Sequence, residues 1–165
     1  MLNEIKNRRS IRKFTLDPID DIIINQIIEM GMWAPSGLNN QPWKFVVVKN
    51  RECLEELSRQ TTYSHIIQNA PVCIAVFLDT AESYHREKDI QAIGACLQNM
   101  LLTIHHLGFG GVWLGEILNN RKEVEKILDV PDSLELMSVV ALGHPAEKKA
   151  NGIRKSINQV VIARK

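Results

Sequence analysis

Ala34-Pro35-Ser36-Gly37-Leu38-Asn39-Asn40-Gln41-Pro42-Trp43 is the stretch around which this chain is organised. It follows a long apolar segment with helical periodicity and precedes a short run typical of a β-strand. Its two prolines restrict the backbone, and its serine, asparagines and glutamine supply hydrogen-bond donors and acceptors. A stiff polar loop between two packed elements suits a planar, hydrogen-bonding ligand, although a loop that only ends a helix contains the same residue types.

Length and composition are those of one globular domain spanning residues 1–165. The chain is 45% hydrophobic and 24% charged, and its formal net charge of +1 argues against nucleic-acid binding driven by bulk electrostatics. No apolar run reaches the ~20 residues of a membrane span, so we expect no membrane association. The first six residues lack the apolar core of a signal peptide. Three widely spaced cysteines without a C-x-x-C pair favour a reducing, cytoplasmic location.

The hydrophobic pattern predicts interleaved helices and strands. We expect helices at residues 2–7, 19–33, 51–59, 89–107 and 121–128, and strands at residues 45–48, 72–78, 109–115, 134–142 and 157–161. The run at 72–78 is almost continuously apolar, as in a strand buried on both faces. Residues 61–69 are ambiguous, and residues 79–88 are polar and typical of a loop. Interleaved elements of this kind predict a three-layer α/β or α+β sandwich.

Several residues are expected to begin or end these helices. Asp17 and Pro18 would be the N-cap and first residue of the second helix, and Asn50 would cap the third. Asn120 with Glu123 resembles a capping box. Gly108 is a natural C-cap for the helix at residues 89–107. That helix is apolar around nearly its whole circumference, which places it centrally or at a subunit interface.

A cluster of cationic residues lies near the start of the chain. It reads Arg8-Arg9-Ser10-Ile11-Arg12-Lys13-Phe14. Guanidinium groups suit phosphate because their planar fork binds two oxygens at once. Taken alone, the same stretch is more typical of a solvated basic patch.

The common catalytic motifs are absent from the sequence. No G-x-G-x-x-G follows a strand, and neither a Walker A sequence, H-E-x-x-H nor G-x-S-x-G occurs. His105 and His106 are adjacent, so they point to different sides of a helix and make a poor metal pair. We therefore expect no bound metal and no hydrolase chemistry.

Three stretches taken together resemble the FMN-dependent nitroreductase family: residues 8–14, residues 34–43, and Gly111-Val112-Trp113-Leu114-Gly115. The resemblance extends to Leu142-Gly143-His144-Pro145 and a basic tail, in the expected order along nearly the whole chain. It implies an α+β, three-layer sandwich whose central, mostly antiparallel sheet is flanked by helices. It also implies a domain-swapped homodimer with two FMN molecules at its interface.

The resemblance implies a role in cofactor binding for each motif. The FMN phosphate, ribityl chain and pyrimidine edge would be held by Arg8, Arg9, Ser10 and Arg12, and the phosphate would be reached from the C-terminal side by Arg154 and Lys155. The isoalloxazine would be flanked from the other subunit by Pro35, Ser36, Gly37 and Asn39. Flavin N5 would be approached by Leu114, Gly115 and Glu116. The helix at residues 89–107 would form the core of the dimer interface, so a charge at Leu97 should separate the subunits, and the strand at 157–161 would extend across the partner.

The activity implied is that of an oxidoreductase in which FMN carries the chemistry and no protein side chain is catalytic. NAD(P)H would pass hydride to flavin N5, and a nitroaromatic or quinone acceptor would then take its place in a ping-pong cycle. The alternatives are a flavin-binding module or sensor without physiological turnover, and a flavoenzyme of the same fold with other chemistry, such as reductive dehalogenation. The chain has no room between residues 72 and 110 for a long insertion over the flavin. A middle-region flavin contact is expected within residues 63–69.

Overall fold

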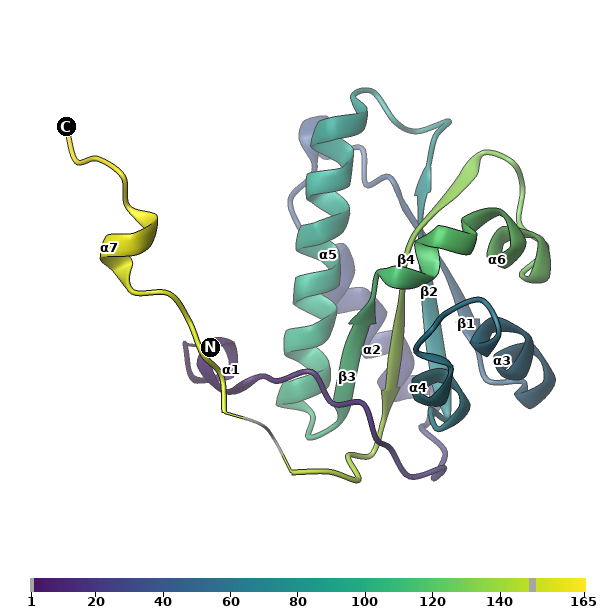
Figure 1. The fold of residues 1–165 in the computed structure, drawn as a ribbon. Coiled ribbons are helices and arrows are strands. Elements are labelled where there is room, and N and C mark those ends of the chain that lie inside the picture. Colours follow the sequence, from purple (N-terminus) through teal and green to yellow (C-terminus); the bar gives the residue numbers. More distant parts are fainter. Residues whose placement is uncertain (1, 149–150) are drawn as a thin grey trace.

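The computed structural model describes residues 2–148 and 151–165. Its centre is a sheet of four strands, β1 (Trp43–Val48), β2 (Val72–Asp79), β3 (Gly110–Leu114) and β4 (Leu134–Gly143). The strand order is β1-β2-β4-β3, and every neighbouring pair is antiparallel. Helices cover both faces of this sheet (Figure 1). The predicted three-layer α+β sandwich is confirmed.

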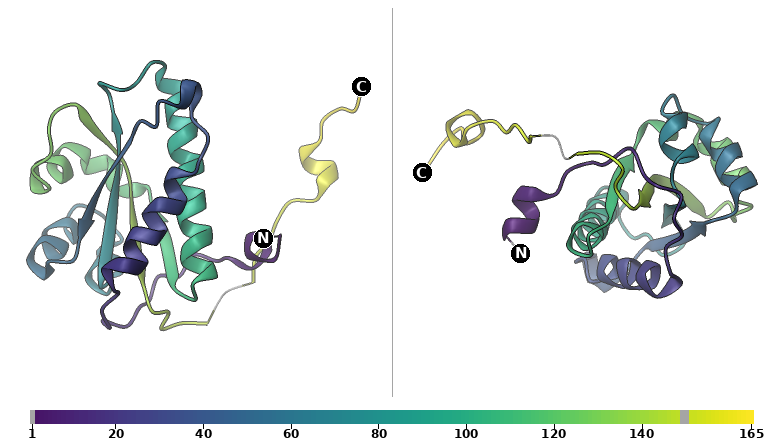
Figure 2. Two further views of the ribbon diagram at one scale, coloured as in Figure 1. Left: turned by 180° about the vertical axis from the view of Figure 1, so that it is seen from behind. Right: turned by 90° about the horizontal axis from the view of Figure 1, so that it is seen from below.

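Five of the seven α-helices among the described residues cover the two faces of the sheet. The helices are α1 (Leu2–Asn7), α2 (Asp21–Met32), α3 (Arg51–Ser58), α4 (Ser64–Gln68), α5 (Arg86–His106), α6 (Arg121–Ile127) and α7 (Ile157–Val160). Apolar side chains of α2 and α5 pack on one face of the sheet, and those of α3, α4 and α6 pack on the other. The view from below in Figure 2 separates the two helical layers.

Strand β2 is the centre of the core. All eight of its residues are buried, as the continuous apolar run predicted. Ile74 and Val76 contribute to the cluster beneath α2 and α5, whereas Ala75 and Phe77 contribute to the opposite cluster. The two faces of one strand therefore join both layers of the sandwich.

Helix α5 is the longest helix among the described residues. One residue of the expected dimer interface is instead buried inside the protomer. Leu97 is 1% exposed and lies in the core beneath the sheet, so a charge there would disrupt the protomer before it could test a dimer. The exposed side of α5 instead carries Ile90, Gln91 and Gln98. The expected C-cap is confirmed: Gly108 follows the helix with φ of +85°, a conformation that glycine adopts without strain.

One expected helix start and one expected capping box are wrong for local reasons, although α6 begins at Arg121 as expected. Helix α2 is preceded by Asp20 rather than Asp17, because the Asp17 carboxylate accepts a hydrogen bond from Thr15 Oγ1 instead of capping a helix. Asn120 makes no side-chain cap for α6, and its Nδ2 donates to the carbonyl of Gln60. Asn50 does cap α3, accepting from the backbone N–H of Cys53 at 2.9 Å.

Three further segments differ from their sequence-based expectation. Helix α5 begins at Arg86, inside the expected loop at 79–88, and the ambiguous span 61–69 contains α4. The expected strand at 157–161 is wrong: residues 157–160 form α7, because Ser156 and Gln159 satisfy each other in a capping box. The whole segment 151–165 is exposed and extends away from the body (Figures 1 and 2). We call residues 151–165 the C-terminal arm.

No helix among residues 2–148 and 151–165 combines the length and the apolar character that crossing a membrane requires.

Candidate functional site

Backbone pairing brings three of the sequence motifs together at one edge of the sheet. Ser10 forms a parallel bridge with Gly111, and the N–H of Ile11 donates to the Gly111 carbonyl at 3.1 Å. The chain approaches β3 closely because Gly110 lacks a side chain: a Cβ there would lie 2.7 Å from Ile11. Phe14 then bridges Pro145 in the fourth motif. The basic segment is thereby held along β3 and the end of β4.

Three arginines gather where the C-terminal arm passes the start of the chain. The pKa of the Arg8 guanidinium is lowered, first by burial and then by the charges of Arg154 and Arg9. The arm crosses Arg9 closely, since a Cβ on Gly152 would lie 2.5 Å from Arg9 Nη2. Like charges held together in a partly buried place favour a bound anion, which relieves their repulsion. Lys155 is exposed beside Arg154 and makes no hydrogen bond or ion pair within the described residues.

A hollow of about 200 Å³ opens beside the end of β3. Arg12 lies on its wall, as do Leu114 and Gly115. Tyr63, just before α4, and Ile66, within α4, also line the hollow. The structure thus places part of the expected middle region, residues 63–69, next to the glycine-containing turn.

Glu116 connects the turn after β3 to the segment before α4. Its Oε2 accepts hydrogen bonds from Thr61 Oγ1 at 2.5 Å and from the N–H of Thr62 at 3.0 Å. These bonds, with the Thr61 hydroxyl as the largest cause, lower the pKa of the Glu116 carboxyl. Sequence reasoning placed Glu116 near the site but missed this tether, since nothing in the local pattern relates residues 55 positions apart.

The loop at residues 34–43 has an unusual backbone. Leu38, Asn39 and Gln41 have φ of 54°, 54° and 49°, in the left-handed region that non-glycine residues rarely adopt. The Ser36 hydroxyl accepts from the N–H of Gln41 at 3.0 Å, and Asn40 Nδ2 donates to Asp89 at 2.9 Å. Such conformations cost free energy and persist only where surrounding contacts fix them, which is common at ligand sites.

A second hollow, of about 290 Å³, lies between this loop and the first turns of α5. Pro35, Ser36 and Gly37 line one side, and Tyr84 and Lys88 line the other. Gly37 allows the Tyr84 ring to pack directly on this loop, because a Cβ there would lie 1.8 Å from the Tyr84 hydroxyl and would force that side chain to move. Asn39 lies in the same loop but is not part of this hollow's wall. Sequence reasoning missed Tyr84 and Lys88, because their stretch showed only polar, loop-like composition.

The segment that carries Arg8 and Arg9 and the loop at residues 35–40 lie at opposite ends of α5. Near its C-terminal end, His106 Nδ1 is 3.5 Å from Glu4 Oε1 of α1, which precedes the arginines. Near its N-terminal end, Asp89 holds the loop at residues 35–40. A helix of 21 residues is about 30 Å long. One chain therefore does not bring both segments to the same planar ligand.

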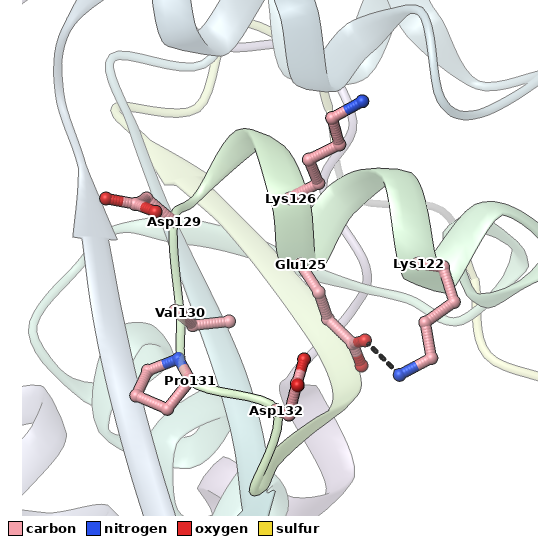
Figure 3. A pocket seen from close by; sticks show the side chains of 7 residues that line it. All are labelled: Lys122, Glu125, Lys126, Asp129, Val130, Pro131 and Asp132. Atoms are coloured by element: carbon pink, nitrogen blue, oxygen red, sulfur yellow. Dashed lines mark hydrogen bonds and ion pairs between the residues drawn. The ribbon is translucent and has the colours of Figure 1, made fainter.

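A further hollow, of about 230 Å³, lies at the end of α6 and contains no expected site residue (Figure 3). Glu125 accepts from Lys122 Nζ at 2.8 Å and from the N–H of Leu136 at 2.9 Å, so its carboxylate serves to attach α6 to β4. In the part of the chain that the structure describes, no three His, Cys, Asp or Glu side chains are grouped to hold a metal ion.

Comparisons of the sequence and of the structure with known proteins all point to one family. The profile of the nitroreductase family matches residues 5–61 and 55–144. A provisionally named NADH dehydrogenase/NAD(P)H nitroreductase of Methanothermobacter thermautotrophicus is 36% identical over 89% of this chain and 78% of its own. A provisionally named nitroreductase of Desulfovibrio desulfuricans, solved in complex with FMN, is 40% identical, with a TM-score of 0.94 over 99% of this chain and 96% of that one.

A more distant structure shows the same fold. The NADPH:FMN oxidoreductase of Vibrio harveyi, solved with NAD+, has a TM-score of 0.89 at 26% identity, over 99% of this chain and 76% of that one. The family profile matches most of the chain, and the M. thermautotrophicus relative is similar over most of its length. The profile match includes the motif segments that pair along β3. This chain is therefore a member of the nitroreductase family.

Proposed function

We propose that this chain is an FMN-dependent oxidoreductase that uses NAD(P)H to reduce nitroaromatics, quinones or similar acceptors. The observation that carries the proposal is the cluster formed by Arg8, Arg9 and Arg154, which lies beside the motif segments paired along β3. Family membership and the FMN complex of the D. desulfuricans relative support the same cofactor.

The chemistry of the donor set fits FMN. A phosphate monoester carries close to two negative charges. The pKa of Arg8 is lowered first by burial and then by the charges of Arg154 and Arg9, and a bound phosphate would offset that repulsion. Ser10 adds a hydroxyl donor for the phosphate or ribityl chain. Arg12, in the hollow beside Leu114 and Gly115, is suited to the pyrimidine edge, where a cation stabilises the negative charge of a reduced flavin. Lys155 extends the cationic surface beside Arg154.

We further propose that the active form is a homodimer in which each flavin site is shared. Pro35, Ser36, Gly37 and Asn39 lie about one α5 length from the arginines of their own chain, so a second copy would supply this loop to the site. The exposed C-terminal arm carries apolar side chains, Ile162 being 99% exposed, that a partner surface would cover. The arm would then extend across the surface of the partner, with residues 157–160 as helix α7 and the rest as extended chain.

FMN, when bound, would supply hydride acceptance and donation. The chain's own residues would bind and orient: arginines hold the charged end, Arg12 the ring edge, and the partner's loop one face. NAD(P)H and the acceptor would occupy the same open face in turn, which predicts ping-pong kinetics. We place this enzyme in the reducing cytoplasm, a location supported by Cys53, Cys73 and Cys96 being free thiols.

The test is an absorbance spectrum of the purified protein, recorded before and after anaerobic addition of NADH and then NADPH. A flavin spectrum that bleaches with either donor is the expected result. Colourless protein that also fails to bind added FMN would contradict the proposal. Bound flavin that neither donor reduces would favour the alternative of a flavin-binding module without turnover.

A further inference from the structure

The hollow at the N-terminal end of α5 has two side chains that no family motif includes. Tyr84 lies directly against Gly37, and the Lys88 ammonium lies 5.4 Å from the centre of the Tyr84 ring. Both side chains share the hollow with Pro35 and Ser36 of the loop that the proposed function places against the flavin ring.

Buried Asp89 fixes this arrangement. Its Oδ2 accepts from the N–H groups of Tyr84 at 3.2 Å and His85 at 3.1 Å, and from Ser83 Oγ at 2.7 Å. Its Oδ1 accepts from Asn40, which belongs to the loop on the other side of the hollow. A single carboxylate therefore holds both walls, so the hollow is preformed in the protomer.

The positive charge in the hollow belongs to Lys88. Within residues 2–148 and 151–165, Lys88 forms no ion pair with a carboxylate, and its only close interaction is with the face of Tyr84. The remaining wall is small and largely apolar, with Pro35, Ala92 and Ala95. A planar ring can stack on Tyr84 and proline, while an anionic substituent can reach the ammonium.

We propose that this hollow binds the electron acceptor, and that Tyr84 and Lys88 select planar aromatic acceptors that carry an anionic group such as a carboxylate. The proposal rests on the proposed function, because it takes the neighbouring loop to lie against the flavin. It extends that function by naming the class of acceptor and two residues that recognise it.

The experiment compares para-nitrobenzoate with para-nitrobenzamide, which share a ring but differ in charge. Initial rates of the FMN-loaded enzyme give a Michaelis constant for each acceptor with the native protein, Lys88→Ala and Tyr84→Ala. Lys126→Ala, at the hollow of Figure 3, is the matched control for removal of a lysine. The affinity for FMN is measured for every variant by fluorescence titration.

We expect Lys88→Ala to raise the Michaelis constant for para-nitrobenzoate about tenfold, near the lower end of the effect of one charge-assisted hydrogen bond because Lys88 is exposed to solvent. The Michaelis constant for para-nitrobenzamide should rise less than about twofold. Tyr84→Ala should raise both values, and Lys126→Ala neither. Equal changes for the two acceptors with Lys88→Ala would overturn the proposal. So would a Lys88→Ala protein in which only the Michaelis constant for NADPH rises, since Lys88 would then recognise the nucleotide phosphate.

A binding measurement separates this proposal from the proposed function. Ligand-detected NMR with benzoate and benzamide needs no turnover and can be run on the protein with or without FMN. Preferential binding of benzoate that Lys88→Ala abolishes supports the hollow even if neither NADH nor NADPH reduces the flavin. Absence of any preference contradicts it, even in an active reductase.

Discussion

The Nδ2 group of Asn40 donates a 2.9 Å hydrogen bond to Asp89 Oδ1, and this pair joins the first turns of α5 to a loop 49 residues earlier. Asp89 is fully buried, and its other oxygen holds the connection that precedes α5. The strained loop at residues 38–41 is therefore fixed from one point in the core.

Replacing Asp89 by Ala should destabilise the protomer by about 2–3 kcal/mol, because several donors lose a charged acceptor in a buried place. Asp89→Asn should cost less, since one amide oxygen still accepts. Urea unfolding of the cofactor-free protein measures the difference. Glu87→Ala, an exposed change in the same helical turn, is the control, and a shift of equal size for both variants would refute the anchoring role.

The same residue predicts a pH dependence of stability. Burial opposes ionisation of Asp89, but hydrogen bonds from Ser83, from Asn40 and from the N–H groups of His85 and Tyr84 outweigh it, so its pKa lies below the ordinary 3.8. Because the folded-state pKa is depressed, the unfolded chain binds this proton more readily. The contribution is then complete above about pH 5 and is lost as pH falls through 3.8 toward the folded value.

Unfolding free energies of the native protein and Asp89→Asn, measured from about pH 7 to pH 3, check this sign. Their difference should be constant at neutral pH and should shrink in acid. A difference that grows as pH falls would show that Asp89 is protonated in the folded protein.

Arg9→Ala and Arg154→Ala should each weaken FMN binding by about 1.5–3 kcal/mol, the range for charge-assisted hydrogen bonds. Added salt should lower the native affinity more than that of either variant, since fewer charges remain to be screened. Fluorescence titration of FMN provides the measurement. Arg59→Ala, which removes an exposed arginine paired with Glu55 on α3, is the control. Unchanged affinity in both site variants would exclude the arginine cluster as the phosphate site.

Gly94 offers a sharper test of the dimer than Leu97, which lies in the core. A Cβ at Gly94 meets no atom within 4 Å in the protomer, so Gly94→Glu should fold normally while placing a charge on the outward side of α5. We expect a monomer that has lost FMN, measured by sedimentation velocity and flavin absorbance. Gly94→Ala should raise protomer stability by about 0.5–1 kcal/mol through helix propensity.

A charge change of at least the same size on α6, Lys126→Glu, should leave the oligomer intact. A monomeric Gly94→Glu protein that keeps its flavin would show that one chain suffices to form the site.

Deletion of the C-terminal arm, residues 151–165, should separate folding from cofactor binding. Every residue of the arm is exposed, so the stability of the cofactor-free protomer should change by less than about 0.5 kcal/mol. FMN affinity and dimer stability should both fall, because Arg154 and the apolar side chains of the arm are removed. Flavin content after gel filtration and the urea midpoint measure the two effects. Native FMN binding by the truncated protein would contradict the role given to the arm.

In the arm, the local hydrophobic pattern predicted the wrong secondary structure. Apolar residues 157–161 have the composition of a strand, but a strand needs a neighbour to pair with its backbone. Within the described chain none is offered, and the Ser156–Gln159 capping box satisfies the backbone locally as a helix instead.

The sequence by itself determined the layers of this protein and the order of its motifs. Burial follows periodicity, so the continuous apolar run of β2 and the long helix at α5 were recognisable from the order of residues alone. The tertiary structure alone decided which distant groups meet: the three arginines, Glu116 with Thr61, and Asp89 with Asn40. Periodicity reports only which side of an element is buried, whereas these contacts depend on how separate elements pack, and that information is not local to any stretch of the chain.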